Sequence, residues 1–155
     1  MNYEFDEKTI KINDDAKIII LNYDADKKLS KFIDNYIVSI CEGASDSDID
    51  CVKSDISDYL STKKQFQRIG AVSEFFAHLY FINKGFKQEC LFFNLEENSP
   101  KKGFDGVYSI LGEFWIMESK SRKFAKNVSH NSNMRIAYND LNDKFMGKKK
   151  KKLKK

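Results

Sequence analysis

The chain has 155 residues, of which 41% are hydrophobic and 14% aromatic, so it can bury the core of one domain and is not disordered by composition. No apolar run approaches the roughly 18 residues that cross a bilayer, and the N-terminal stretch MNYEFDEK lacks a signal-peptide pattern. We therefore expect a cytoplasmic protein with no membrane partner. Three cysteines without a CxxC pair match neither a zinc framework nor a disulfide scaffold.

The net charge of +4 is unevenly distributed along the chain. Residues 1–60 carry 14 acidic and 7 basic side chains, whereas residues 61–155 carry 9 acidic and 20 basic ones. Seven of these bases lie in the terminal stretch GKKKKKLKK, so residues 61–146 alone have a net charge of only +4. The basic half is compatible with a polyanionic partner but does not by itself establish one.

The first part of the chain, residues 1–62, reads as an acidic extension containing a strand and a helix. The β-branched run over residues 17–24 predicts a strand. Apolar residues at helical spacing over 26–43, closed by Gly43, predict a helix. The acidic, serine-rich segment that follows indicates either a loop or a weak helix around residues 52–60.

The strongest helical pattern covers residues 63–85, where apolar residues recur at three and four and Gly85 ends the run. Glu74 lies inside this apolar helix, with the small residues Gly70 and Ala77 and the side chain of His78 one turn away. Small neighbours would let another backbone or a metal approach the Glu74 carboxylate. A surface glutamate is the alternative interpretation.

Three strands and a helix are predicted after this helix. Residues 86–95 read as the first strand, residues 104–111 and 113–121 as a tight hairpin around Gly112, and residues 127–145 as a helix that packs through its apolar side chains. The expected fold is α+β or mixed α/β: a core over 63–146 of helix, three strands and helix. The terminal stretch, residues 147–155, is expected to be a disordered lysine tail.

Charged residues interrupt the hairpin at one end. Hairpin pairing brings Asp105, at the start of one strand, towards Glu118, Ser119 and Lys120 at the end of the other. Side chains at i and i+2 of a strand share a face, so Glu118 and Lys120 should point the same way, with Ser119 opposite and its carbonyl nearby. The sequence thus predicts two carboxylates, a carbonyl and a lysine at one edge of the sheet. A structural pair of Glu118 and Lys120 on the surface is the alternative.

Two carboxylates and a carbonyl are ligands that suit Mg²⁺, and Mn²⁺ by the same chemistry. A divalent ion at such a site can activate water and neutralise charge that develops on a phosphate. Lys120 would lie beside that water or stabilise the transition state. These groups are therefore candidates for hydrolysis of phosphodiester bonds.

The pattern resembles the PD-(D/E)XK, or restriction-endonuclease-like, nuclease superfamily. Asp105 in GFDGVY, Glu118-Ser119-Lys120 as the E-x-K element, and Glu74 in RIGAVSEFFAHLYF carry the resemblance. It implies Asp105, Glu118, Lys120 and Glu74 as catalytic residues, and Asp105, Glu118, the Ser119 carbonyl and Glu74 as metal ligands. Phe104 replaces the proline of the motif, and the final strand of the superfamily core is missing after residue 146.

The chain is also similar, over RIGAVSEFFAHLYF, FNLEENSPKKGFDGVY and WIMESKSR, to the HamA family of nuclease subunits of the bacterial Hachiman anti-phage system. This resemblance implies a DNA-cutting effector that acts with a helicase partner of the HamB type and needs no small-molecule cofactor. Members of that family are longer, in agreement with the missing final strand.

Basic residues flank the proposed site and are candidates for sequence-independent phosphate contacts; they are Lys101, Lys102, Arg122, Lys123 and Lys126. A merely solvated face explains them equally well. Two functional alternatives stay open: a non-catalytic subunit that binds nucleic acid or a partner, and a structural, antitoxin-like protein without a metal. Trp115 is expected in the core, and His78 is expected to make a routine hydrogen bond.

Overall fold

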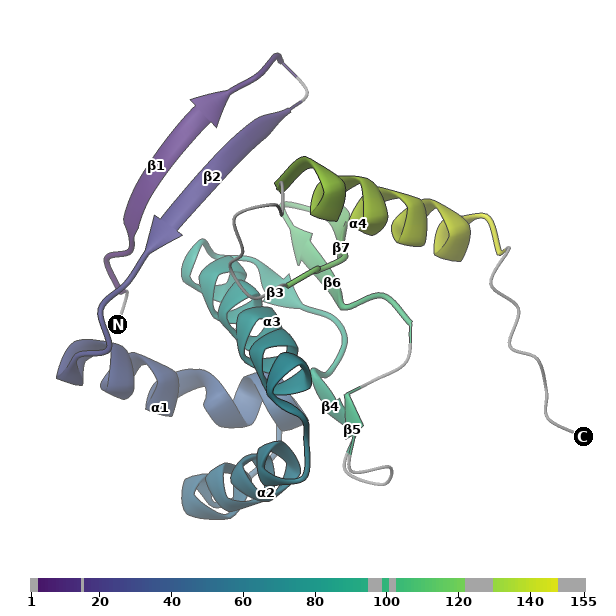
Figure 1. The fold of residues 1–155 in the computed structure, drawn as a ribbon. Helices are drawn as coiled ribbons and strands as arrows, with labels where there is room; N and C mark the ends of the chain where they lie inside the picture. Colours follow the sequence, from purple (N-terminus) through teal and green to yellow (C-terminus); the bar gives the residue numbers. More distant parts are fainter. Residues whose placement is uncertain (1–2, 15, 95–98, 101–102, 122–129, 148–155) are drawn as a thin grey trace, which may run out of the picture. The chain divides into compact units, whose positions relative to one another are not determined.

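The computed structural model describes residues 3–14, 16–94, 99–100, 103–121 and 130–147. Within these ranges it has four α-helices and small antiparallel sheets, so the expected mixture of helices and strands is confirmed (Figure 1). The chain divides into two compact units, residues 1–36 and 37–155. This division falls inside the first helix, earlier than the boundary that the sequence suggested after residue 62.

The first unit contains a hairpin and most of the first helix. Strand β1 (Asp6–Lys11), which the sequence did not reveal, pairs with the expected strand β2 (Lys17–Asn22). Helix α1 (Lys27–Glu42) begins where the Asp26 carboxylate accepts a hydrogen bond from Leu29 N at 2.7 Å. Phe5 and Phe32 pack edge to face, with ring centroids 6.2 Å apart, and form the small core of this unit.

The second unit starts with the last turns of α1 and with helix α2 (Ile49–Ser61). Gly43 ends α1 at a φ of +74°, as the sequence predicted. The carboxylate of Asp48 caps α2 by accepting hydrogen bonds from the backbone N–H groups of residues 50 and 51. The segment after Gly43 therefore contains a regular, capped helix.

Helix α3 (Gln65–Asn83) runs through the second unit and ends before Gly85, which has a φ of +85°. Its C-terminal half carries the buried side chains His78, Leu79 and Tyr80. Phe66, which we expected on the packed face, is 68% exposed because it lies in the first turn. The helix thus packs against the sheet mainly through its second half.

The prediction of one continuous strand over residues 86–95 is wrong. The described part of this range forms two short strands, β3 (Lys87–Gln88) and β4 (Phe93–Asn94), and β4 pairs with β5 (Ser99–Pro100) in a separate sheet. The ladder between β3 and its neighbour stops because the Cys90 sulfur, not a carbonyl, accepts the hydrogen bond of Val107 N at 3.2 Å. Phe92 N then bonds to Ile40 O at the end of α1, which draws the chain away from the sheet.

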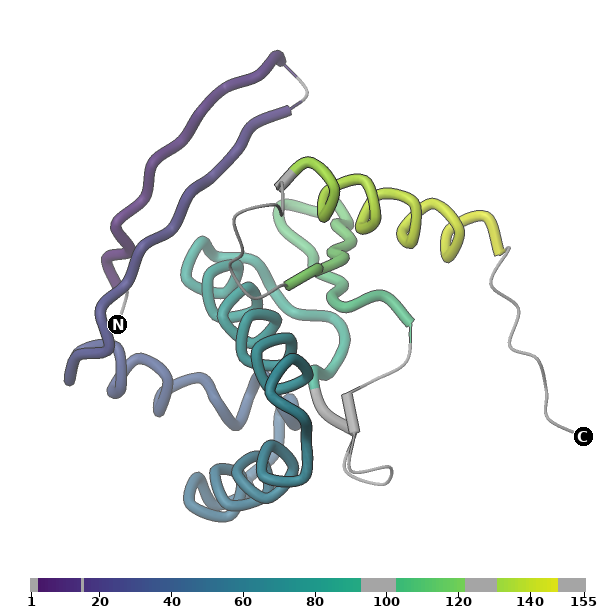
Figure 2. The backbone as a smooth tube through the Cα atoms, in the orientation of Figure 1, coloured from purple at the N-terminus to yellow at the C-terminus, as the bar shows by residue number. Residues whose placement is uncertain are grey.

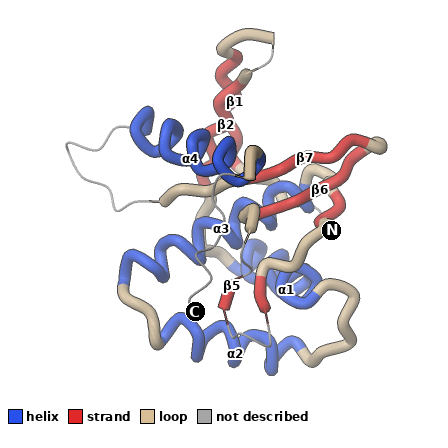
Figure 3. Tube along the Cα trace, turned by 90° about the vertical axis from the view of Figure 1, so that its right-hand side faces the viewer, coloured by secondary structure: helices blue, strands red, loops and turns tan. Residues whose placement is uncertain are grey.

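Strands β6 (Gly106–Ile110) and β7 (Glu113–Met117) form the predicted hairpin, and the sheet order is β3-β6-β7. Leu111 and Gly112 form its turn with φ values of +50° and +84°, the left-handed pair that tight hairpins use. Figures 1 and 2 show this hairpin beside α4, and Figure 3 shows its two strands in red next to the same helix.

Helix α4 (His130–Phe145) confirms the last predicted helix but not its packing. Met134 and Phe145, which we expected to pack, are 56% and 73% exposed. Trp115, expected in the core, is 49% exposed and touches Phe86 edge to face. Strand β7 pairs with no strand but β6 among the described residues. In the part of the chain that the structure describes, no helix has the length and apolarity to cross a membrane.

Candidate functional site

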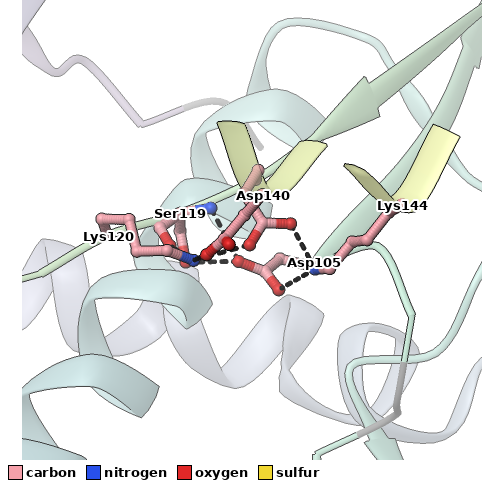
Figure 4. Close-up of polar contacts among 6 residues, drawn as sticks. Asp105, Ser119, Lys120, Asp140 and Lys144 are labelled. Atoms are coloured by element: carbon pink, nitrogen blue, oxygen red, sulfur yellow. Dashed lines mark hydrogen bonds and ion pairs between the residues drawn. The ribbon is translucent and has the colours of Figure 1, made fainter. Parts of the chain in front are cut away.

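The open end of the β6–β7 hairpin brings Asp105 and Glu118 together. Gly106 pairs with Met117, so these two acidic residues follow directly beyond the last pair of the ladder. The Asp105 Oδ2 atom accepts hydrogen bonds from Ser119 N at 2.7 Å and from Ser119 Oγ at 3.0 Å (Figure 4). These two bonds fix the Asp105 carboxylate against the other strand, as the pairing in the sequence predicted.

Ser119 itself differs from expectation. Regular alternation would turn its side chain away from Glu118 and Lys120, but β7 ends at Met117 and the alternation no longer applies. The Ser119 hydroxyl therefore binds Asp105, while the Ser119 carbonyl oxygen accepts a hydrogen bond from Lys120 Nζ at 3.1 Å. The carbonyl does lie beside the site, as expected.

Glu118 is the most deeply buried charged group of the cluster, with a side chain only 3% exposed. A carboxylate in such a place must be paired, because an unpaired buried charge is strongly destabilising. Its Oε1 atom lies 2.6 Å from Lys120 Nζ, and its Oε2 atom pairs with Lys144 Nζ. Glu118 is thus bound by two ammonium groups, which excludes the simple exposed surface pair.

The Lys120 ammonium group is surrounded by oxygen atoms, two of which belong to carboxylates. Its ammonium group contacts Glu118, the Ser119 carbonyl and, at 3.1 Å, Asp140 Oδ2. Partial burial lowers the pKa of Lys120, but the hydrogen bonds to Glu118 and Asp140 outweigh it and the net pKa is raised. In this arrangement Lys120 is a firmly protonated hydrogen-bond donor.

Glu74 on α3 faces the same cluster. Burial, and next the charges of Asp105 and Glu118, raise the pKa of Glu74 to about 7, although Lys144 and Lys120 act in the opposite direction. Near this helix a Cβ added to Gly70 would make only an ordinary contact, 3.5 Å from the Ser121 hydroxyl, so the expected close approach to Glu74 stays a prediction. The structure therefore brings all four predicted acidic and basic site residues to one place.

Helix α4 supplies two members that sequence reasoning missed, Asp140 and Lys144. Asp140 pairs with Lys120, and Lys144 Nζ lies 3.6 Å from Asp105 Oδ1 while also pairing with Glu118 (Figure 4). The spacing of four residues places both side chains on one face of the helix. The sequence therefore shows that Asp140 and Lys144 share a helix face, but it does not show which part of the molecule this face contacts.

The donors suit a hard divalent cation in chemistry: carboxylate oxygens of Asp105, Glu118 and Glu74, and the Ser119 carbonyl oxygen. In the present arrangement, however, the two lysine ammonium groups lie between the carboxylates. Among the described residues, no three His, Cys, Asp or Glu side chains are close enough to share one ion. An ion can therefore use these donors only after an ammonium group has moved.

The Nδ1 atom of His78 lies 2.6 Å from the Tyr108 hydroxyl. This ring nitrogen is therefore bound to strand β6 and not to the acidic cluster. Burial lowers the pKa of His78 to about 4, although the nearby backbone of Asp105 and the side chain of Gln88 act in the opposite direction. His78 Nε2 makes no hydrogen bond of normal geometry. The expectation of a routine hydrogen bond is confirmed for one of the two ring nitrogens.

The five basic residues proposed for phosphate contacts, Lys101, Lys102, Arg122, Lys123 and Lys126, lie outside the described residues, as does the lysine tail. Their contribution stays a prediction.

Comparison of the chain with protein-family models, curated proteins and solved structures finds no match. The function must therefore be argued from the site.

Proposed function

We propose that this chain is a Mg²⁺-dependent nuclease that hydrolyses phosphodiester bonds of DNA. The observation that carries the proposal is the meeting of Asp105, Glu118 and Lys120 at one hairpin end, with Glu74 facing them from α3. Such a set of carboxylates and a lysine is suited to phosphoryl chemistry. The resemblance to PD-(D/E)XK nucleases supports this assignment of the core of helix, hairpin and helix.

Asp105, Glu118 and the Ser119 carbonyl would hold the ion directly and Glu74 would hold it through water, and the bound ion would supply an activated water and positive charge near the phosphate. Lys120, kept protonated by Glu118 and Asp140, would donate a hydrogen bond to a phosphate oxygen as negative charge develops there. The Asp105 carboxylate is oriented for its role by the two hydrogen bonds from Ser119.

The resemblance to HamA extends the proposal to a biological setting. In that setting the chain is the effector nuclease of a bacterial anti-phage system, acts in the cytoplasm and is controlled by a helicase partner. The basic excess of residues 61–155 is compatible with a DNA substrate. A helicase gene beside the gene for this chain would support the extension.

The test is cleavage of supercoiled plasmid by the purified chain with Mg²⁺. We expect nicking or linearisation by the wild type and a loss of at least about 100-fold in rate in Glu118→Ala and Lys120→Ala, since the first removes a ligand of the ion and the second removes the donor to the phosphate oxygen. Glu113→Ala is the matched control, because Glu113 is an exposed carboxylate at the far end of β7. Cleavage that survives both site substitutions contradicts the proposal.

A non-catalytic, partner-binding subunit is the second candidate. It is favoured by the edge of β7 that no described strand covers, since such an edge can pair with another strand. Phe114 and Trp115 of this strand are 76% and 49% exposed. Calorimetry with Mn²⁺ separates the candidates. A nuclease binds the ion in the wild type and loses it in Asp105→Ala, whereas a binding subunit shows no difference between the two.

A further inference from the structure

Both oxygens of the buried Glu118 carboxylate are already bound to ammonium groups in the structure. Oε1 contacts Lys120 Nζ and Oε2 contacts Lys144 Nζ. Because only 3% of the Glu118 side chain is exposed, water cannot replace a departing partner without a large cost. Any cation that enters must therefore exchange with one of these two lysines.

The ammonium group of Lys144 occupies the position that joins the two carboxylates. It pairs with Glu118 Oε2 and lies 3.6 Å from Asp105 Oδ1, while Asp105 Oδ2 is held by Ser119 (Figure 4). A divalent cation bound by Asp105 and Glu118 together would need the same place. Lys144 and the ion are therefore mutually exclusive in this geometry.

The two lysines are held very differently. Lys120 has three separate oxygen partners, from Glu118, Ser119 and Asp140, and adjoins the strand. Lys144 lies in the last turn of α4 and has two oxygen partners, from Glu118 and Asp105, on a flexible four-carbon stem. The two side chains are exposed to a similar degree, so the number of partners is the difference between them. Rotation of this stem alone can move its ammonium group into water, so Lys144 is the one that can leave.

We propose that Lys144 is a built-in competitor for the divalent ion, which closes the site until the ion displaces its ammonium group. The inference rests on the proposed function, because it concerns the regulation of that same site. It explains why Lys144 contacts both Asp105 and Glu118, the two carboxylates that the ion would need. It also implies that the chain binds the ion more weakly than its ligands alone would allow.

The test measures Mn²⁺ binding by calorimetry and by the electron paramagnetic resonance signal of unbound Mn²⁺. We expect Lys144→Met to bind Mn²⁺ at least about tenfold more tightly than the wild type, since the tethered cation no longer competes. Lys144→Arg retains the charge and should stay near the wild-type affinity. Arg135→Met removes an equal charge from an exposed position of α4 and should change the affinity less than about twofold.

A second readout uses thermal unfolding and needs no enzyme activity. In EDTA the midpoint of Lys144→Met should fall below that of the wild type, because Glu118 loses a partner. In excess Mn²⁺ the increase in midpoint should be larger in Lys144→Met than in the wild type. Lys144→Gln, which keeps a polar side chain, repeats both measurements if the methionine variant folds poorly.

The outcomes separate the two proposals. Mn²⁺ binding that depends on Glu118, shown by its loss in Glu118→Gln, but that is equal in Lys144→Met and Arg135→Met overturns the competitor role and leaves the metal site in place. Binding that no variant shows, or that Glu118→Gln leaves unchanged, overturns the metal site and with it the competitor. Tighter binding in Lys144→Met alone supports both.

Discussion

The Tyr108 hydroxyl lies 2.6 Å from His78 Nδ1, and the two side chains are 1% and 0% exposed. This contact joins strand β6 to helix α3, and Tyr108 follows Asp105 by three residues in the chain. Since both partners are shielded from water, the bond is costly to remove: a lone buried donor or acceptor loses its hydrogen bond and gains none from solvent.

Replacement of Tyr108 by phenylalanine should destabilise the protein by about 1–3 kcal/mol, because it leaves His78 Nδ1 buried without a partner. The free energy of unfolding in urea, from the transition midpoint, measures the effect. Tyr138→Phe is the matched control, since Tyr138 is 68% exposed and its variant should stay within about 0.5 kcal/mol of the wild type. Equal midpoints for the two variants would show that the buried contact contributes nothing.

His78 and Glu74 should make opposite contributions to stability as the pH falls. Burial lowers the pKa of His78 to about 4, so its contribution is complete above the unfolded pKa of 6.5 and is lost as the pH falls towards 4. Burial and the charges of Asp105 and Glu118 raise the pKa of Glu74 to about 7, so its contribution grows as the pH falls from 7 towards 4.5. Each can reach about 3 kcal/mol, and in the wild type they largely cancel.

Single variants should reveal these two contributions in buffers that contain EDTA. Glu74→Gln should lose stability between pH 6.5 and 4.5, because the His78 contribution is no longer offset. His78→Gln should gain stability over the same range, because the Glu74 contribution remains alone. Urea unfolding at several pH values provides the measurement. Parallel curves for the two variants would contradict the opposite signs.

The sequence was most informative where structure is decided locally. The left-handed pair Leu111 and Gly112 fixes the β6–β7 hairpin, and the hairpin alone determines that Asp105 meets Glu118. Helix α3 could be predicted because its apolar residues recur regularly and Gly85 ends it. For these elements neighbouring residues carry all the information that is needed.

The remainder depended on contacts between distant segments. The break after Gln88 arises because Cys90 and Phe92 find partners at Val107 and Ile40, which no local pattern reveals. Asp140 and Lys144 share a helix face, but only the packing of α4 brings that face to Glu118. The expected direction of Ser119 was wrong for a smaller reason, namely that β7 ends at Met117, before the residues whose alternation the expectation assumed.

Two glycines should respond to alanine in opposite directions. A Cβ at Gly106 would lie 2.7 Å from a ring carbon of Tyr108 and 3.1 Å from the Met117 methyl group, and both side chains are buried. Gly106→Ala should therefore cost about 1–3 kcal/mol through overpacking. Gly70→Ala meets only an ordinary contact of 3.5 Å inside α3 and should gain about 0.5–1 kcal/mol in helix propensity. Urea midpoints of the two variants on either side of the wild type are the expected result.

The cysteines should differ sharply in their reaction with Ellman's reagent. Cys41 is 1% exposed, and burial raises the pKa of its thiol to about 12, so at pH 8 only about 1 molecule in 10⁴ carries the reactive thiolate there. Cys51 is exposed on α2 and should react at the rate of a free thiol. Cys90 is partly exposed, so the test uses the double variant Cys51→Ser/Cys90→Ser, in which Cys41 should be labelled only as fast as the protein unfolds. Rapid labelling of Cys41 in the native double variant would show that the end of α1 is not buried as the structure places it.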